Sequence, residues 1–174
     1  MNRKTLISTI AFAFITLLSF NVNAQNFSGL DKSPLDISMT RDKSVKIVYS
    51  RPQLKGRDIA KLAPNGKMWR TGANEGTEIT FYNNTTIGGK KVEAGTYTLT
   101  TIPGEKEWTI VLNSNLNVWG GNAGSRYNKD TEVARFTAKV SKGDESLEAF
   151  SIAFDKNNTM YLGWDTVRVA IPIN

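Results

Sequence analysis

Residues 108–112 read Trp-Thr-Ile-Val-Leu, so that the apolar residues at 108, 110 and 112 alternate with Thr109 and Val111. Successive side chains of an extended strand point to opposite faces of a sheet, and this period of two predicts a strand with one face on a core. Pro103-Gly104 precedes the segment, and residues 96–102 before that turn are rich in Thr, Tyr and Leu. The two segments together predict a β-hairpin.

The same short-strand pattern recurs on both sides of this hairpin. Val45, Ile47 and Tyr49 alternate with Lys46 and Val48, and further strand-like segments are separated by turn signals such as Gly88-Gly89. The expected strands outside the hairpin cover residues 35–39, 45–49, 78–82, 85–87, 90–92, 131–140, 146–154, 159–164 and 167–173.

Residues 57–63 form the only helical phrase after the N-terminal segment, with Asp58 near its start, where a carboxylate suits the helix dipole. Many short strands and one short helix predict an all-β fold, an antiparallel β-sandwich or a jelly-roll-like arrangement.

The N-terminus has the three parts of a secretory signal peptide. Arg3 and Lys4 form a basic region, residues 5–20 carry no charge, and Val22-Asn23-Ala24 provides small residues for cleavage before Gln25. We therefore expect a signal peptide over 1–24, an N-terminal lead-in over 25–40 and a single β domain over 41–174. The expected location is the periplasm or the cell exterior, with no membrane span after cleavage.

The composition excludes several kinds of chemistry. The 174 residues include no His and no Cys, which removes Ser-His-Asp and Cys-His nucleophile systems, the usual zinc ligands, ordinary haem ligation and thiol redox chemistry. We expect no cofactor and no metal. Removal of two of the 22 basic residues with the signal peptide leaves 20 against 16 acidic residues, a mild excess that predicts no nucleic-acid partner.

Charged residues gather in two of the expected connections. Arg51, Lys55 and Arg57 follow one strand, and Arg70 precedes another; the planar guanidinium group of arginine suits carboxylate or phosphate recognition. These residues equally suit ion pairs that brace the loops, because structural pairs also concentrate at such positions.

Aromatic and polar residues complete the candidate ligand-binding site. Trp69, Asn74 and Glu75 offer an apolar face, an amide and a carboxylate, and Trp119 lies in a glycine-rich segment whose small neighbours favour exposure. The alternative places Trp69 in the core, since tryptophan is mostly buried, and makes Trp119 a cap. Trp108 lies inside a strand pattern and is expected in the core, as is Trp164.

Four phrases of the chain resemble a known family. They are Tyr49-Ser50-Arg51-Pro52, Lys55-Gly56-Arg57, the run from Trp69 to Glu75 (W-R-T-G-A-N-E), and Gly95-Thr96-Tyr97 with residues 101–105 (T-I-P-G-E). The chain resembles the exported bacterial family called domain of unknown function 2911, from about residue 35 to the C-terminus. The resemblance implies export from a bacterium and a compact β domain, and it implies no activity.

Three functions fit these observations. The first is a non-catalytic module of the bacterial envelope that binds a small polar ligand or an envelope protein, with the site formed by Arg51, Arg57, Trp69, Arg70, Asn74, Glu75 and Trp119. The second is a carboxylate-dependent hydrolase acting on glycans, with Glu75 as acid or base and a second carboxylate nearby. The third is a structural envelope protein whose loops dock a partner.

Overall fold

Antiparallel strands dominate the computed structural model, which describes residues 29–116 and 127–174. The strands in this part of the chain are β1 (Leu35–Met39), β2 (Val45–Ser50), β3 (Thr77–Phe81), β4 (Thr85–Ile87), β5 (Lys90–Val92), β6 (Gly95–Ile102), β7 (Glu107–Asn113), β8 (Glu132–Phe154) and β9 (Met160–Ile171). The helix α2 (Ile59–Leu62) lies between β2 and β3, and a 3-10 turn (Lys129–Thr131) precedes β8. The expected all-β fold is confirmed.

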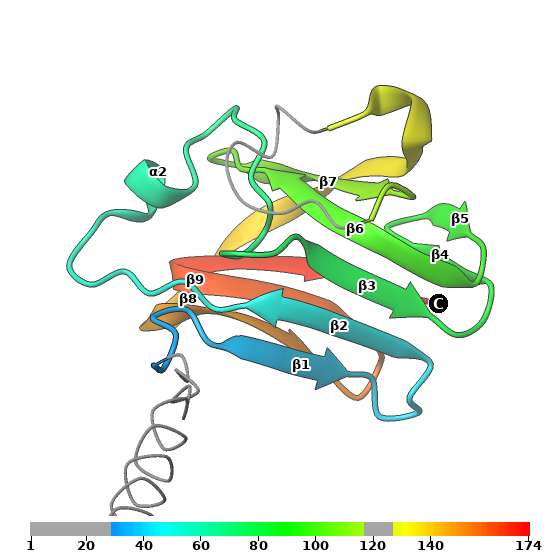
Figure 1. Ribbon diagram of the computed structural model, residues 1–174, viewed down its shortest axis with the longest axis horizontal. Helices are drawn as coiled ribbons and strands as arrows, with labels where there is room; N and C mark the ends of the chain where they lie inside the picture. Colours follow the sequence, from blue (N-terminus) through cyan, green and yellow to red (C-terminus); the bar gives the residue numbers. More distant parts are fainter. Residues whose placement is uncertain (1–28, 117–126) are drawn as a thin grey trace, which may run out of the picture. The chain divides into compact units, whose positions relative to one another are not determined.

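Seven strands form one curled sheet in the order β1-β2-β3-β6-β7-β8-β9, and β4 pairs with β5 in a separate hairpin. Figure 1 shows β8 and β9 lying behind β2 and β3, so the curled sheet makes two layers. Isolated pairs link Gln53, just after β2, to Ala149 on β8, and link Ile87 on β4 to Ile173, just after β9. The arrangement is the sandwich-like one that the alternation predicts.

The long strand β8 explains the curl. Its first part pairs with β7, from Glu132 opposite Asn113 to Lys139 opposite Glu107, and the part from Val140 onward pairs with β9. The prediction of separate strands at 131–140 and 146–154 is therefore wrong. The register shifts between Lys142 and Ser151 instead, and such bulges bend a strand without ending it.

A second expected break is also absent. Residues 159–164 and 167–173 were expected as two strands, whereas β9 runs through both to Ile171. Asp165, between them, has φ 48°, so the backbone irregularity that the sequence indicates is present as a local kink within the strand.

The short helix forms where the sequence indicates it, over fewer residues than the expected 57–63. Asp58 is its N-cap, and the Oδ1 atom of Asp58 accepts a hydrogen bond from the Ala60 amide at 2.8 Å. This contact satisfies one of the amides that a helix start leaves without a partner.

The core lies between the layers and follows the predicted alternation. Ile47, Ile79 and Leu99 on adjacent strands are completely buried. Trp108 and Trp164 are buried as expected, and both contact Trp69: the Trp69 and Trp164 rings stack with centroids 5.4 Å apart, and Trp108 meets Trp69 edge-on. Such aromatic groups contribute large apolar areas to a fold that has no disulfide.

Strand β1 lies within residues 25–40, the segment expected as an N-terminal lead-in, and adds a strand to the edge of the sheet. All five of its residues pair with β2, from Leu35 opposite Ser50 to Met39 opposite Lys46. Asp31–Asn174 accordingly form one compact unit.

Candidate functional site

Arg51 braces one corner of the sandwich. Its Nε atom donates to the Phe150 carbonyl at 3.1 Å, and Nη2 donates to the Ser151 hydroxyl at 2.8 Å. Its Nη1 atom lies 3.4 Å from the carboxylate of Asp36. The guanidinium group therefore ties the end of β2 to β1 and β8.

Tyr49 reinforces the same corner from the core side. Its hydroxyl donates to Asp36 at 3.1 Å and accepts from the Ile152 amide at 2.9 Å. Burial raises the pKa of Tyr49 to about 12, because the ionised phenol would lose hydration there. Asp36, Tyr49 and Arg51 thus form a polar latch between β1, β2 and β8, which we call the corner latch.

Arg57 acts within its own turn. Its Nε atom donates to the Leu54 carbonyl at 2.9 Å and its Nη2 atom to the Gln53 carbonyl at 2.8 Å. The side chain is exposed, and these contacts fix the chain between β2 and α2.

The loop that carries W-R-T-G-A-N-E begins as part of the core. The Trp69 amide donates to the Thr101 carbonyl at 2.7 Å, and the Thr101 amide donates back at 2.9 Å. This pairing holds the indole in the aromatic core, with only 9% of Trp69 exposed. A Cβ atom on Gly72 would lie 3.0 Å from both the Ser50 carbonyl oxygen and the Thr77 hydroxyl, so the glycine lets the loop pack closely against the end of β2.

The second half of this loop is tied to its surroundings by polar contacts. Asn74 has φ 55°, and its amide group donates to Asp31 at 2.7 Å. The Glu75 carboxylate accepts from the Ser50 hydroxyl at 3.0 Å and is otherwise exposed. Arg70 is half-buried in the same loop.

The structure therefore brings three predicted residues, Arg51, Asn74 and Glu75, to one end of the sandwich. Asn74 and Glu75 contact Asp31 and Ser50, next to the corner latch that contains Arg51, and Arg57 occupies the adjoining turn. Trp119 lies outside the described residues. The hydrogen bonds and the ion pair of these side chains give them a bracing role, and the ligand site itself stays a prediction.

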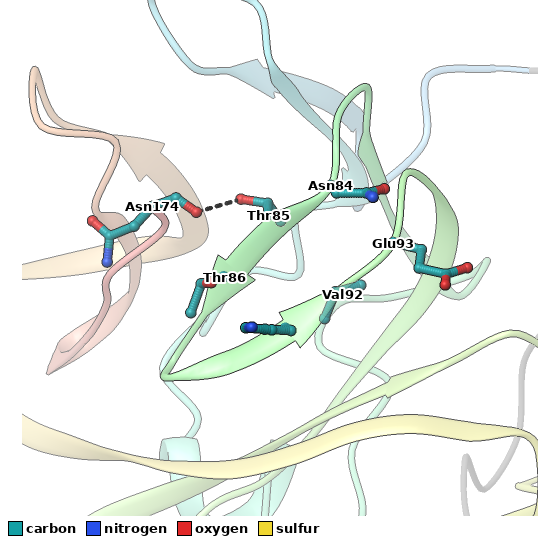
Figure 2. A pocket seen from close by; sticks show the side chains of 7 residues that line it. Asn84, Thr85, Thr86, Val92, Glu93 and Asn174 are labelled. Atoms are coloured by element: carbon teal, nitrogen blue, oxygen red, sulfur yellow. Dashed lines mark hydrogen bonds between the residues drawn. The ribbon is translucent and has the colours of Figure 1, made fainter.

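An open pocket of about 490 Å³ lies elsewhere, between the β4–β5 hairpin and Asn174 (Figure 2). The Thr85 hydroxyl donates across it to the Asn174 carbonyl at 2.9 Å, and the Asn84 side chain accepts from the Ala94 amide at 2.8 Å. These polar groups are already paired within the protein. The pocket is lined by Asn84, Thr85, Thr86, Lys91, Val92, Glu93 and Asn174, and includes no residue of the predicted site.

A smaller pocket of about 180 Å³ adjoins Asp42 on the turn between β1 and β2. The Ser44 hydroxyl, which donates to Asp42 at 2.7 Å, is the main reason that the pKa of this carboxyl lies below its usual range. Within residues 29–116 and 127–174, no group of three or more acidic side chains is placed to hold a metal ion.

The least expected surface is the outward face of β1. Leu35 and Ile37 are each 59% exposed and Met39 is 41% exposed, at alternate positions of the strand. Asp36, between them, faces inward to the corner latch. We call Leu35, Ile37 and Met39 the β1 stripe. Its alternation was visible in the sequence, but the alternation alone does not say which face meets the core.

No helix in the described ranges has the length and hydropathy needed to cross a membrane. No curated protein and no solved structure matches the chain. Residues 33–173 match the family model described as protein of unknown function (DUF2911), a span that starts just before β1 and ends after β9. The chain therefore belongs to the DUF2911 family.

Proposed function

We propose that this chain is an exported, non-catalytic module of the bacterial envelope that docks a partner protein through the β1 stripe. The observation that carries the proposal is the exposure of Leu35, Ile37 and Met39 side by side on one face of an edge strand. Contiguous apolar surface of this kind marks interaction sites in folded proteins, whereas single exposed apolar residues are ordinary.

The stripe is held in place by a rigid frame. Val48 on β2 lies directly opposite Ile37 and is half-buried, so the apolar surface continues from the edge strand onto the sheet. The corner latch fixes β1 from the opposite face through Asp36. A preorganised apolar surface loses little conformational entropy on binding, which favours docking.

Export rests on the sequence. The basic start, the uncharged run over residues 5–20 and the small residues before Gln25 are typical of a signal peptide. Mass spectrometry of the protein from the cell envelope should find Gln25 at the N-terminus. An uncleaved chain in the cytoplasm would refute this part of the proposal.

The hydrolytic alternative has no observation of its own in this structure. Glu75 is exposed, accepts a hydrogen bond from Ser50, and lines neither of the two pockets described above. The β1 stripe therefore remains the better-supported site.

Docking can be tested by site-specific photo-crosslinking in living cells. A benzoylphenylalanine at position 37 should give one discrete adduct, and the added change Leu35→Asp should abolish it. The same group at Val133, which is 42% exposed on β8, is the matched control and should give none. An adduct that forms equally from both positions, or that survives Leu35→Asp, would contradict docking through the stripe.

A further inference from the structure

The hydrogen bonds at the two ends of β1 determine which backbone groups face its open edge. The Arg51 amide donates to the Pro34 carbonyl and the Thr40 amide donates to the Val45 carbonyl, each at 3.0 Å. Hydrogen-bonded pairs alternate along an antiparallel ladder, so Asp36 and Ser38 turn their backbone groups to β2. The remaining residues, Leu35, Ile37 and Met39, turn theirs to the open edge.

The residues with open-edge backbone groups are therefore those of the exposed stripe. An added strand would meet three N–H and three C=O groups, with three apolar side chains on one face. The central donor is already covered, because the Ile37 amide donates to the Asp36 side chain at 2.9 Å. Pairing must displace this local contact, which weakens association and protects the edge in the single chain.

The sequence of β1 is self-complementary about its centre. In an antiparallel pair of two copies with Ile37 opposite Ile37, Leu35 lies opposite Met39 at both ends. Leu35, Ile37 and Met39 then each form a hydrogen-bonded pair with a residue of the other copy. The β1 stripes of the two copies join into one apolar row. On the other face Asp36 lies opposite Ser38, so no two like charges are directly opposed.

We infer that the partner at the β1 edge is a second copy of this chain, paired antiparallel through Leu35–Met39 about a two-fold axis at Ile37. The inference rests on the proposed function and names its partner. A two-fold contact uses the same surface on both copies, which a self-complementary strand provides. A five-residue edge is short, so the interface is at the small end, below about 1,200 Å², and the dimer should form reversibly as concentration rises.

The absence of cysteine from the sequence allows a direct test. In the expected pair, the two Ile37 positions are about 5.5 Å apart between Cα atoms, within the range that a disulfide can bridge. The purified Ile37→Cys protein, without its signal peptide, should form a disulfide dimer under mild oxidation. Val133→Cys, an exposed apolar site on β8, is the matched control and should remain monomeric on the same time scale.

The register is tested with two further single-cysteine proteins. Leu35→Cys and Met39→Cys should form the mixed disulfide when combined, several-fold faster than either forms a disulfide alone. Equal rates for all combinations would overturn the antiparallel register. In sedimentation equilibrium the unsubstituted protein should show a dimer, and Ile37→Lys should abolish it. If the unsubstituted protein is a monomer at every concentration up to about 1 mM, the inference that the partner is a second copy is wrong.

The two proposals fail in different ways. If position 37 photo-crosslinks to a different protein in cells while the purified chain stays monomeric, docking stands and the second copy is wrong. If position 37 gives neither adduct nor disulfide dimer, both proposals are wrong. An adduct with twice the mass of the processed chain supports both.

Discussion

Strands β1 and β2 lie side by side and alternate in the same way, yet they present their apolar residues to opposite sides. In β2, Val45, Ile47 and Tyr49 are buried, whereas in β1 the apolar residues are exposed and Asp36 faces inward. The corner latch explains the difference, because Tyr49 and Arg51 supply partners for an inward carboxylate. Alternation thus predicts a strand, and the partners available on each side decide which face is buried.

The largest contrast between the two strands should appear in a matched pair of isoleucine truncations. Ile47 on β2 is completely buried and Ile37 on β1 is 59% exposed. Ile47→Ala should lower the free energy of unfolding by about 2–5 kcal/mol through lost burial and the cavity left behind. Ile37→Ala should change it by less than about 0.5 kcal/mol, as surface substitutions do. Urea denaturation measures both, and equal losses would contradict the outward orientation of β1.

The next effect concerns the hydroxyl of Tyr49. Tyr49→Phe leaves the Ile152 amide without its acceptor and removes a donor from Asp36, which should lower the free energy of unfolding by about 1–3 kcal/mol. Urea denaturation of the two proteins at neutral pH tests this. An unchanged free energy of unfolding in Tyr49→Phe would mean that the corner latch does not join β2 to β8.

The same hydroxyl predicts a pH dependence. The folded-state pKa of Tyr49 is raised from 10.0 to about 12, so the folded state holds the phenol proton more tightly than the unfolded state. The stability that comes from the neutral hydroxyl is therefore complete below the unfolded-state pKa of 10.0. It is lost as the pH rises toward the folded-state pKa of about 12. Urea midpoints measured over this window should fall more steeply for the unsubstituted protein than for Tyr49→Phe. Parallel curves would show that Tyr49 does not titrate with the fold.

Removal of the inward carboxylate should have a smaller effect, since Asp36 is partly exposed. Asp36→Ala should cost about 1–2 kcal/mol in unfolding free energy, because Arg51 and the Ile37 amide lose an acceptor. Asp31→Ala removes a carboxylate that accepts from Asn74 at the surface, and it serves as the matched control with a change under about 0.5 kcal/mol. If Asp36→Ala and Asp31→Ala lowered the free energy of unfolding by similar amounts, the corner latch would not explain the orientation of β1.

The smallest effect is expected at the predicted polar site. Glu75→Gln keeps an acceptor for the Ser50 hydroxyl, so stability should change by less than about 0.5 kcal/mol. Crosslinking from position 37 should be unchanged in this variant. A loss of the adduct would return the binding site to the loop that contains Glu75.

Local patterns predicted much of the fold. The bounds of β1, β4 and β5 coincide with the expected ones, and Asp58 caps the short helix α2. The breaks expected at residues 141–145 and 165–166 became irregularities inside β8 and β9, because the pairing between the two strands resumes beyond the irregular residues, with Leu147 opposite Asp165. Sequence signals for a turn and for a bulge are similar, and the neighbouring strand decides between them.

The candidate site was less predictable for a physical reason. The partners of Arg51 at Phe150 and Ser151 lie about a hundred residues away in sequence, so nothing local indicates whether its charge is used internally. Trp69 joins the core through its pairing with Thr101, another distant contact. The outward orientation of the β1 stripe was not predictable from β1 alone, since Tyr49 and Arg51, the inward partners of Asp36, come from β2 and the residue after it.

The most direct measurement replaces Val48 with the photo-crosslinking residue. Position 48 lies opposite Ile37 and is not part of the β1 stripe, so the stripe can be changed independently of the crosslinker. With Ile37→Lys in the same chain, we expect the adduct to disappear while the urea midpoint stays within error of the unsubstituted protein. An undiminished adduct would contradict docking through the β1 stripe, and a large loss of stability would show that Ile37 belongs to the core.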